Sequence, residues 1–145
     1  MRLTELVAAV REVPVEVAGA PCDPYIRDPD IRDPDIGAVV HDTGAVAGGA
    51  LFCCVRGSRT DGHDLAPAAV AGGAAALLVD HVLPLDVPQV VARDVRAAMG
   101  PVAAAFWGHP SRDLAVVGVT GTAGKTTMTH LLAAVLTAAG RPCSV

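Results

Sequence analysis

The segment Leu65–Val79, LAPAAVAGGAAALLV, indicates the fold class of this 145-residue chain. Pro67 suits the first turn of a helix over Leu65–Ala71, and the glycine pair that follows suits its end. The apolar run Ala75–Val79 then predicts a buried strand. A helix that passes directly into a buried strand is the repeating unit of an α/β fold with parallel strands.

The same alternation extends to both sides of this segment. Asp94 is expected to cap a helix that runs towards Trp107, with Gly100 and Pro101 kinking or interrupting it. Near the start of the chain, Thr4 is expected to cap a short helix with one apolar stripe. Further strands are expected at Ala38–Val40, Leu51–Val55, Val90–Val91 and Leu114–Val119, and a last helix at Thr126–Ala139, closed by Gly140.

Composition limits the classes of function. Hydrophobic residues make up 52% of the chain and aromatic residues 3%, which predicts a core of small side chains. The formal net charge is -4 and the basic residues are scattered, which argues against a nucleic-acid groove or an anionic membrane surface. The longest apolar run, Ala68–Val79, is shorter than the roughly 18–20 residues that a membrane span needs. With no signal-peptide pattern at the start, the protein is expected in the cytoplasm.

Cysteine and histidine spacing argues against a metal site. The four cysteines show no CxxC pattern, and Cys53 and Cys54 are expected to be small buried residues facing opposite ways in one strand. The five histidines are isolated from one another in the sequence, and none is proposed as a metal ligand or general base: His41, His63, His81, His109 and His130.

The most specific motif is Gly118–Thr126, GVTGTAGKT, between an expected strand and an expected helix. Its glycines let the backbone turn tightly and present amides to phosphate oxygens, next to the positive end of the helix. Lys125 can reach the β- and γ-phosphates of a nucleotide, and the Thr126 hydroxyl can bind Mg²⁺. The sequence therefore predicts a phosphate-binding loop for a nucleoside triphosphate.

The general loop pattern G-x-x-x-x-G-K-[ST] places a glycine where this chain has Val119, so a glycine-rich turn without a ligand is the alternative. A phosphate loop alone does not distinguish kinases, GTPases and ligases. A small P-loop kinase or GTPase would carry its loop near the N-terminus, with an acidic strand after it. Here the loop begins only at Gly118.

The shifted glycine resembles the ATP loop of the Mur ligase family, G-[IV]-T-G-[TS]-N-G-K-T-[TS], with Ala123 in place of Asn or Ser. Phe106–Leu114, FWGHPSRDL, is similar to the segment that precedes the ATP loop in the family's tripeptide-adding members. Leu51–His63, LFCCVRGSRTDGH, is similar to the strand and the Asp-Gly-His segment of the same members. The resemblance runs from about Gly37 to Val145. The sister enzymes that add D-Ala-D-Ala share the architecture but look less alike in these segments.

The resemblance implies an ATP-dependent ligase of peptidoglycan synthesis that adds the third amino acid to UDP-MurNAc-L-Ala-D-Glu. In that family ATP and Mg²⁺ convert a substrate carboxylate into an acyl phosphate, which the incoming amine attacks. Thr126 would also bind the Mg²⁺. The ATP-binding residues implied are Gly118, Thr120, Gly121, Thr122, Ala123, Gly124, Lys125, Thr126 and Thr127.

The resemblance also implies a site for the uridine end of the nucleotide sugar. Asp42 and Thr43 fall at the family's Asp-Ser pair, although Gly44 replaces the arginine that follows it. The short loop of Ser58, Arg59 and Thr60 would touch the same group. The alternative is that these segments are ordinary turns and that Arg59 is a solvated surface charge.

The expected architecture is a small N-terminal α/β domain, residues 1–108, that binds the UDP-sugar. Residues 109–145 would begin the central ATP-binding domain, which is expected to be truncated because one strand and one helix cannot bury both faces of a sheet. No catalytic residue is expected within the chain, so this polypeptide is expected to be inactive. A non-catalytic UDP-sugar-binding module or a decayed gene product is the alternative.

The expected partners are the small-molecule substrates UDP-MurNAc-dipeptide, ATP and an amino acid, and the oligomeric state stays open. A repeated IRDPD, within the proline-bearing stretch Pro21–Asp35, is interpreted as a slipped duplication in a surface loop without a function.

Overall fold

The computed structural model describes residues 1–10, 15–18, 33–58, 60–141 and 143–145, with only the backbone described for 15–18. It divides into two compact units, Met1–Pro110 and Ser111–Val145, which are described separately. Most of the proline-bearing stretch and its duplication lie outside the described residues. Among the described helices, none combines the length and the apolar character needed to cross a membrane.

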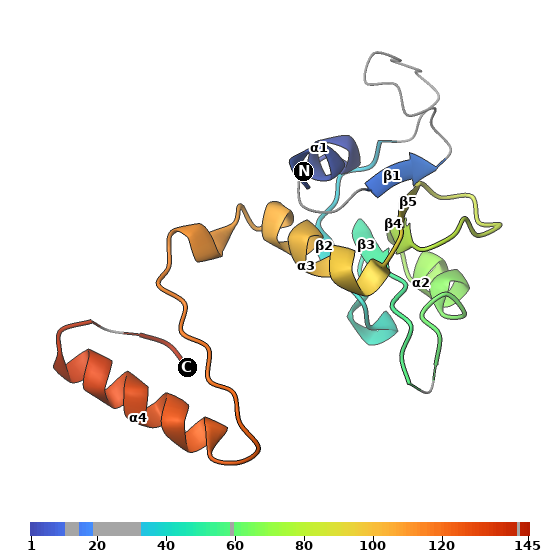
Figure 1. Ribbon diagram of the computed structural model, residues 1–145. Coiled ribbons are helices and arrows are strands. Elements are labelled where there is room, and N and C mark those ends of the chain that lie inside the picture. Colours follow the sequence, from blue (N-terminus) through green and yellow to red (C-terminus); the bar gives the residue numbers. More distant parts are fainter. Residues whose placement is uncertain (11–14, 19–32, 59, 142) are drawn as a thin grey trace. The chain divides into compact units, whose positions relative to one another are not determined.

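The first unit is built on a five-stranded sheet (Figure 1). Four neighbouring strands run parallel, which confirms the expected α/β fold. A fifth strand, β1, was not predicted and joins the edge antiparallel to β5. The order is β1-β5-β4-β3-β2, with bounds β1 Val15–Ala18, β2 Ala38–Val40, β3 Ala50–Cys53, β4 Ala74–Val79 and β5 Gln89–Ala92.

Helices cover both faces of this sheet. Helices α1 (Leu3–Ala9) and α3 (Val95–Phe106) share one hydrophobic cluster with alternate residues of β3 and β4. Helix α2 (Ala66–Ala71) packs in a second cluster with the intervening residues of the same strands. The predicted helix entry through Pro67 and its end at Gly72 are confirmed.

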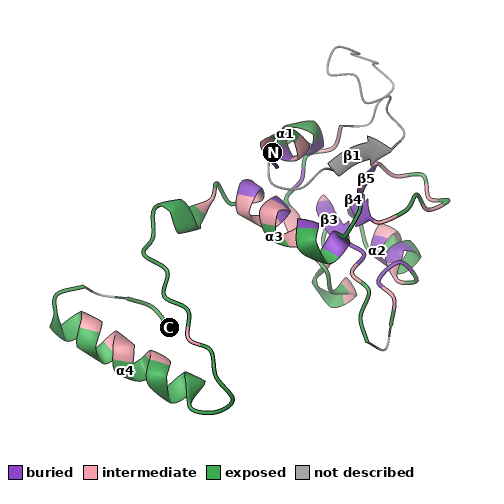
Figure 2. Ribbon diagram, in the orientation of Figure 1, coloured by how far each residue is buried: buried purple, intermediate pink, exposed green. Residues whose placement is uncertain are grey.

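The central strands are buried on both faces, as Figure 2 shows for β3 and β4. Successive side chains therefore belong to different clusters: Cys53 lies with α1 and α3, and Cys54 lies with α2. Both thiols are fully buried, as predicted. Small side chains at these positions let the helices approach the sheet closely.

The N-terminal helix begins differently from the prediction. Its N-cap is Arg2, whose backbone N–H donates to the Glu5 carboxylate at 3.0 Å. Thr4 lies inside the helix, and its N–H and hydroxyl both donate to the Asp33 carboxylate, at 3.0 and 2.8 Å. The expectation that Thr4 is the cap was wrong, because a carboxylate distant in sequence binds its polar atoms instead.

Helix α3 is capped as predicted, since the Asp94 carboxylate accepts the N–H of Ala97 at 3.0 Å. Pro101, however, lies within one continuous helix, and the expected interruption is absent. Proline removes one backbone hydrogen bond. Burial of Val95, Ala98 and Val102 on the sheet offsets that loss.

The second unit contains helix α4 (Lys125–Ala138), followed by Gly140 at φ 75°. The predicted strand Leu114–Val119 is not formed, and Leu114, Val116 and Val117 are 65–71% exposed. A strand needs a neighbour to accept its backbone hydrogen bonds, and no strand lies among the described residues of this unit. The apolar stripe of α4 is exposed or half-buried rather than a core.

The buried thiols give a direct test of the core. Burial, reinforced by the neighbouring Cys54, raises the pKa of Cys53 to about 12, and burial raises that of Cys54 to about 12 as well. Because the thiolate is the reactive form, iodoacetamide at pH 8 should label the exposed Cys143 at least about a hundredfold faster than Cys53 or Cys54. Peptide mass spectrometry measures the three rates. Similar rates in the folded chain would contradict this packing, whereas urea should make all three sites alike.

Gly62 gives a second test, of the turn that follows β3. A Cβ at this position would lie 2.6 Å from Val55 N and 2.7 Å from the Cys54 carbonyl carbon. Gly62→Ala should therefore lower the free energy of unfolding by about 1–3 kcal/mol in urea titrations. Gly48→Ala, which meets nothing within 4 Å, is the matched control. Equal stability of the two variants would mean that the turn is not packed this tightly.

Candidate functional site at the carboxyl edge of the sheet

The parallel strands of the first unit all deliver their following loops to one edge of the sheet. These loops begin after Val40 in β2, Cys53 in β3, Val79 in β4 and Ala92 in β5. Ligands of open α/β sheets bind outside the carboxyl ends of the strands. This edge is therefore the part of the first unit where a small-molecule site is expected.

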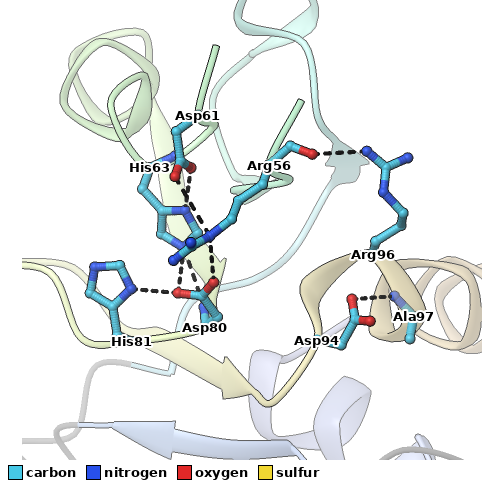
Figure 3. Close-up of polar contacts among 8 residues, drawn as sticks. All are labelled: Arg56, Asp61, His63, Asp80, His81, Asp94, Arg96 and Ala97. Atoms are coloured by element: carbon cyan, nitrogen blue, oxygen red, sulfur yellow. Dashed lines mark hydrogen bonds and ion pairs between the residues drawn. The ribbon is translucent and has the colours of Figure 1, made fainter. Parts of the chain in front are cut away.

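A buried histidine joins two of these loops. His63, in the loop after β3, is 6% exposed, and its Nδ1 lies 2.6 Å from Asp61 Oδ1. Its Nε2 lies 3.3 Å from the backbone nitrogen and 3.2 Å from Oδ1 of Asp80, the first residue after β4. The imidazole therefore spans from its own loop to the end of the neighbouring strand (Figure 3).

Two further side chains meet at Asp80. Arg56 Nε donates to Asp80 Oδ2 at 2.9 Å and lies 3.6 Å from Asp61 Oδ2. His81 contacts Asp80 Oδ1 through Nδ1 and stacks on His63, with ring centroids 4.8 Å apart. We refer to Arg56, Asp61, His63, Asp80 and His81 as the His63 network.

Both carboxylates of the His63 network are held in the ionised form. The backbone N–H of His63, and then its imidazole, lower the pKa of Asp61 despite partial burial. Burial alone raises the pKa of Asp80, but the hydrogen bonds from His81 and Arg56 and the nearby positive charge outweigh it and lower the pKa. An ionised Asp61 accepts the His63 Nδ1–H, so Nε2 is left to accept the backbone N–H of Asp80.

The donor atoms of His63, Asp80 and His81 lie within 4.8 Å of one another, as those of a cation site would. Two of these residues already have partners within the protein, however. The Asp80 backbone N–H faces His63 Nε2, and the guanidinium of Arg56 occupies the other carboxylate oxygen. The geometry is that of a hydrogen-bonded network.

The start of α3 also contacts the His63 network. Arg96, in the first turn of α3, donates from Nη2 to the backbone carbonyl of Arg56 at 2.9 Å. Figure 3 shows this contact beside the Asp94 cap of α3. The loops after β3 and β4 and the first turn of α3 are thus connected through polar contacts with Arg56.

The structure places Asp42 and Thr43 at this edge, directly after β2. Asp42 caps the short 3-10 helix η1 (Thr43–Ala45) and accepts the Gly44 N–H at 2.9 Å. Asp42 is exposed and Thr43 is half-buried. A turn of this kind presents a carboxylate and a hydroxyl at the edge, and ligand contacts for both residues stay a prediction.

Ser58 and Thr60 lie in the turn after β3, and both are exposed. The base of this turn is closed by the Gly57 N–H, which donates to the Thr60 carbonyl at 3.0 Å, and by a bridge between Arg56 and Asp61. Arg59, the third residue of the predicted contact loop, lies outside the described residues.

The predicted phosphate loop lies in the second unit and is exposed. Gly121 and Gly124 have φ of 156° and 74°, and Gly124 is the N-cap of α4. No side chain caps this helix, so its first amides have no side-chain partner in the described residues. The Lys125 ammonium lies over the loop and donates to the Gly121 carbonyl at 2.5 Å.

Sequence analysis missed the His63 network. It treated the histidines as isolated, but His63 and His81 stack although 18 positions separate them. A usable signal was present: His63 follows β3 and the Asp80–His81 pair follows β4 directly, and such residues meet at one edge of a parallel sheet.

Comparisons with known proteins agree with this geometry. The family described as "Mur ligase family, catalytic domain" matches residues 35–107, half of the chain. A UDP-N-acetylmuramoyl-L-alanyl-D-glutamate--2,6-diaminopimelate ligase of Halalkalibacterium halodurans is 48% identical over 69% of this chain. A UDP-N-acetylmuramyl-tripeptide synthetase of Roseiflexus sp. is 46% identical over 72%. The chain spans only 21% of the length of each relative.

Solved structures give the same result. MurF from Acinetobacter baumannii aligns with a TM-score of 0.63 and 28% identity, covering 74% of this chain and 24% of that one. MurF ligase from Thermotoga maritima, solved in complex with ADP, aligns with a TM-score of 0.55 and 29% identity, covering 70% and 23%. The fold, the family match and these relatives together show that the chain belongs to the Mur ligase family.

Proposed function

We propose that this chain is the front part of an ATP-dependent amide ligase of peptidoglycan precursor synthesis. Its first unit would bind the nucleotide sugar, and its second unit would contribute the phosphate loop for ATP. The parent reaction would add diaminopimelate or lysine to UDP-MurNAc-L-Ala-D-Glu in the cytoplasm. The observation that carries the proposal is the family match over a unit whose four parallel strands end at one edge of the sheet.

The nucleotide-sugar role is supported by the loops at that edge. Asp42 and Thr43 follow β2, and Ser58 and Thr60 lie in the turn after β3, so parallel neighbouring strands deliver all four to the same edge. Carboxylate and hydroxyl groups suit the polar atoms of a uridine. The names of the Halalkalibacterium halodurans and Roseiflexus relatives describe enzymes that act on or form UDP-N-acetylmuramoyl compounds.

The ATP role is supported by the loop before α4. Glycines at 121 and 124 allow its backbone conformation, and the uncapped helix directs free amides and a positive dipole towards any phosphate bound there. Lys125 would turn from the Gly121 carbonyl to the β- and γ-phosphates, and Thr126 would bind Mg²⁺ through its hydroxyl. The Thermotoga maritima relative binds ADP by its title.

The chemistry supplied by bound ATP is phosphoryl transfer to a substrate carboxylate, and the amine of the incoming amino acid then displaces phosphate from the acyl phosphate. In that reaction, Lys125 and the amides of the loop would neutralise the transferring charge. Such catalysis depends on several groups that act together. The 145-residue chain spans 21% of the length of the Halalkalibacterium halodurans relative. It is therefore expected to bind its ligands but not to catalyse the ligase reaction.

A non-catalytic UDP-sugar-binding module is the second candidate. The observation that favours it is the contrast between the two units: the first has two buried clusters, whereas α4 has no buried residue. A module of this kind would bind the nucleotide sugar and give no response to ATP.

A thermal-shift series separates these candidates. Under the proposal, UDP-MurNAc-L-Ala-D-Glu at 100 times its Kd should stabilise the chain by about 2.7 kcal/mol, and Mg-ATP should give a further response. A response to the nucleotide sugar alone would favour the binding module. No response to either ligand would contradict the proposed function.

The ATP loop can be tested through Lys125, the only lysine in the chain. Amine acetylation can modify just Lys125 and the N-terminal amine of Met1, so Mg-ATP should slow acetylation of Lys125 while Met1 serves as an internal control.

Lys125→Ala should weaken Mg-ATP binding by at least about tenfold in calorimetry, because one charge-assisted contact to phosphate is lost. Arg141→Ala, an exposed cation beyond the same helix, should leave affinity unchanged. Unprotected Lys125 together with unchanged affinity would rule out this loop as the ATP site.

A further inference from the structure

We infer that Asp80 and His63 are positioning residues of the nucleotide-sugar site, which hold the turn after β3 in its binding position without touching the ligand. The inference rests on the proposed function of the first unit. It assigns a role to the His63 network, in which His63 is buried and whose members are not among the predicted contact residues.

The turn after β3 needs an external support. Ser58 and Thr60 are exposed. Among the described residues, the turn is closed internally by the Gly57 to Thr60 and Gly62 to Val55 backbone hydrogen bonds and by the Arg56–Asp61 bridge. A short exposed turn closed in this way opens at low cost in free energy. Contacts from neighbouring elements must therefore fix where it lies.

Asp80 supplies most of those polar contacts. It binds Arg56 at the start of the turn through Oδ2 at 2.9 Å, and beyond the end of the turn its backbone N–H donates to His63 Nε2 at 3.3 Å. Asp80 is also fixed itself, since it follows directly on the end of β4, whose last four residues are buried. Asp80 therefore holds both ends of the turn to a rigid strand, Arg56 through its carboxylate and His63 through its backbone N–H.

His63 makes the clamp rigid. Its imidazole is 6% exposed and bridges Asp61 on the turn to Asp80 on the strand end. The adjoining Gly62 packs its backbone on Val55 with no room for a Cβ, which leaves His63 little freedom to shift. Loss of either partner would leave a buried polar group without its hydrogen bond, a costly state. The turn would then sample other positions, and a ligand bound by it would have to pay for its ordering.

The test is calorimetric affinity of the 145-residue chain for UDP-MurNAc-L-Ala-D-Glu. Asp80→Asn should weaken binding about tenfold, because it removes the charge that holds Arg56. Asp64→Asn is the matched control: Asp64 is exposed, adjoins His63 and makes no side-chain hydrogen bond or ion pair among the described residues, and its variant should bind within twofold of wild type.

Two isosteric replacements of His63 distinguish its contacts. His63→Gln places an amide near the Nε2 position and should keep part of the contact to Asp80, whereas His63→Asn can keep only the contact to Asp61. The glutamine variant should therefore retain more affinity. Equal loss in both variants would overturn the role given to the Asp80 contact.

A double-mutant cycle with Thr60→Ala separates positioning from general loss of structure. If Asp80 acts through the turn, Asp80→Asn should cost less affinity in the Thr60→Ala background than in wild type. Additive effects would overturn the inference, as would wild-type affinity in Asp80→Asn. Arg56→Gln changes a 63% exposed side chain and replaces Asp80→Asn if that variant folds poorly. A wild-type chain that fails to bind the nucleotide sugar would instead overturn the proposed function itself, and the inference with it.

Discussion

The parallel hydrogen-bonded pairing of β3 with β4 is the constraint on which the rest of the first unit depends. Both strands are buried on both faces, so each successive side chain must fit one of two helical layers. Parallel pairing also brings the carboxyl ends of the two strands together. That single geometric fact places the loop after β3 beside the residues that follow β4.

The residues that follow the ends of β3 and β4 contact one another through polar side chains. His63 is buried and Asp80 is partly buried, so their polar groups need partners, and the described residues contain no buried side-chain nitrogen or oxygen without one. A satisfied network of this kind fixes one arrangement, because any other leaves a donor or acceptor unpaired. The stability of the loop and its proposed use as a ligand-binding element thus have a common physical origin.

The second unit shows what happens without such pairing. Its loop and helix form as local signals require: glycines at 121 and 124 take conformations with positive φ, and α4 extends from Lys125 to Ala138. The apolar segment before the loop stays extended without becoming a strand, since no described strand of this unit lies beside it. The predicted phosphate loop can therefore take its local conformation although no strand lies beside it among the described residues of this unit.

The sequence by itself determined those features that depend on neighbouring residues along the chain. Pro67 and the glycines after α2, the Asp94 cap, and the apolar runs of β3 and β4 act within one turn or one strand, and each was predicted. The tertiary structure decided what depends on distant backbone. In it, β1 pairs antiparallel with the edge strand β5, Arg2 is the N-cap of α1, and residues 114–119 do not form a strand. It also joined His63 to Asp80 across 17 positions, because strand order and register, which no local signal encodes, determine which loop ends meet.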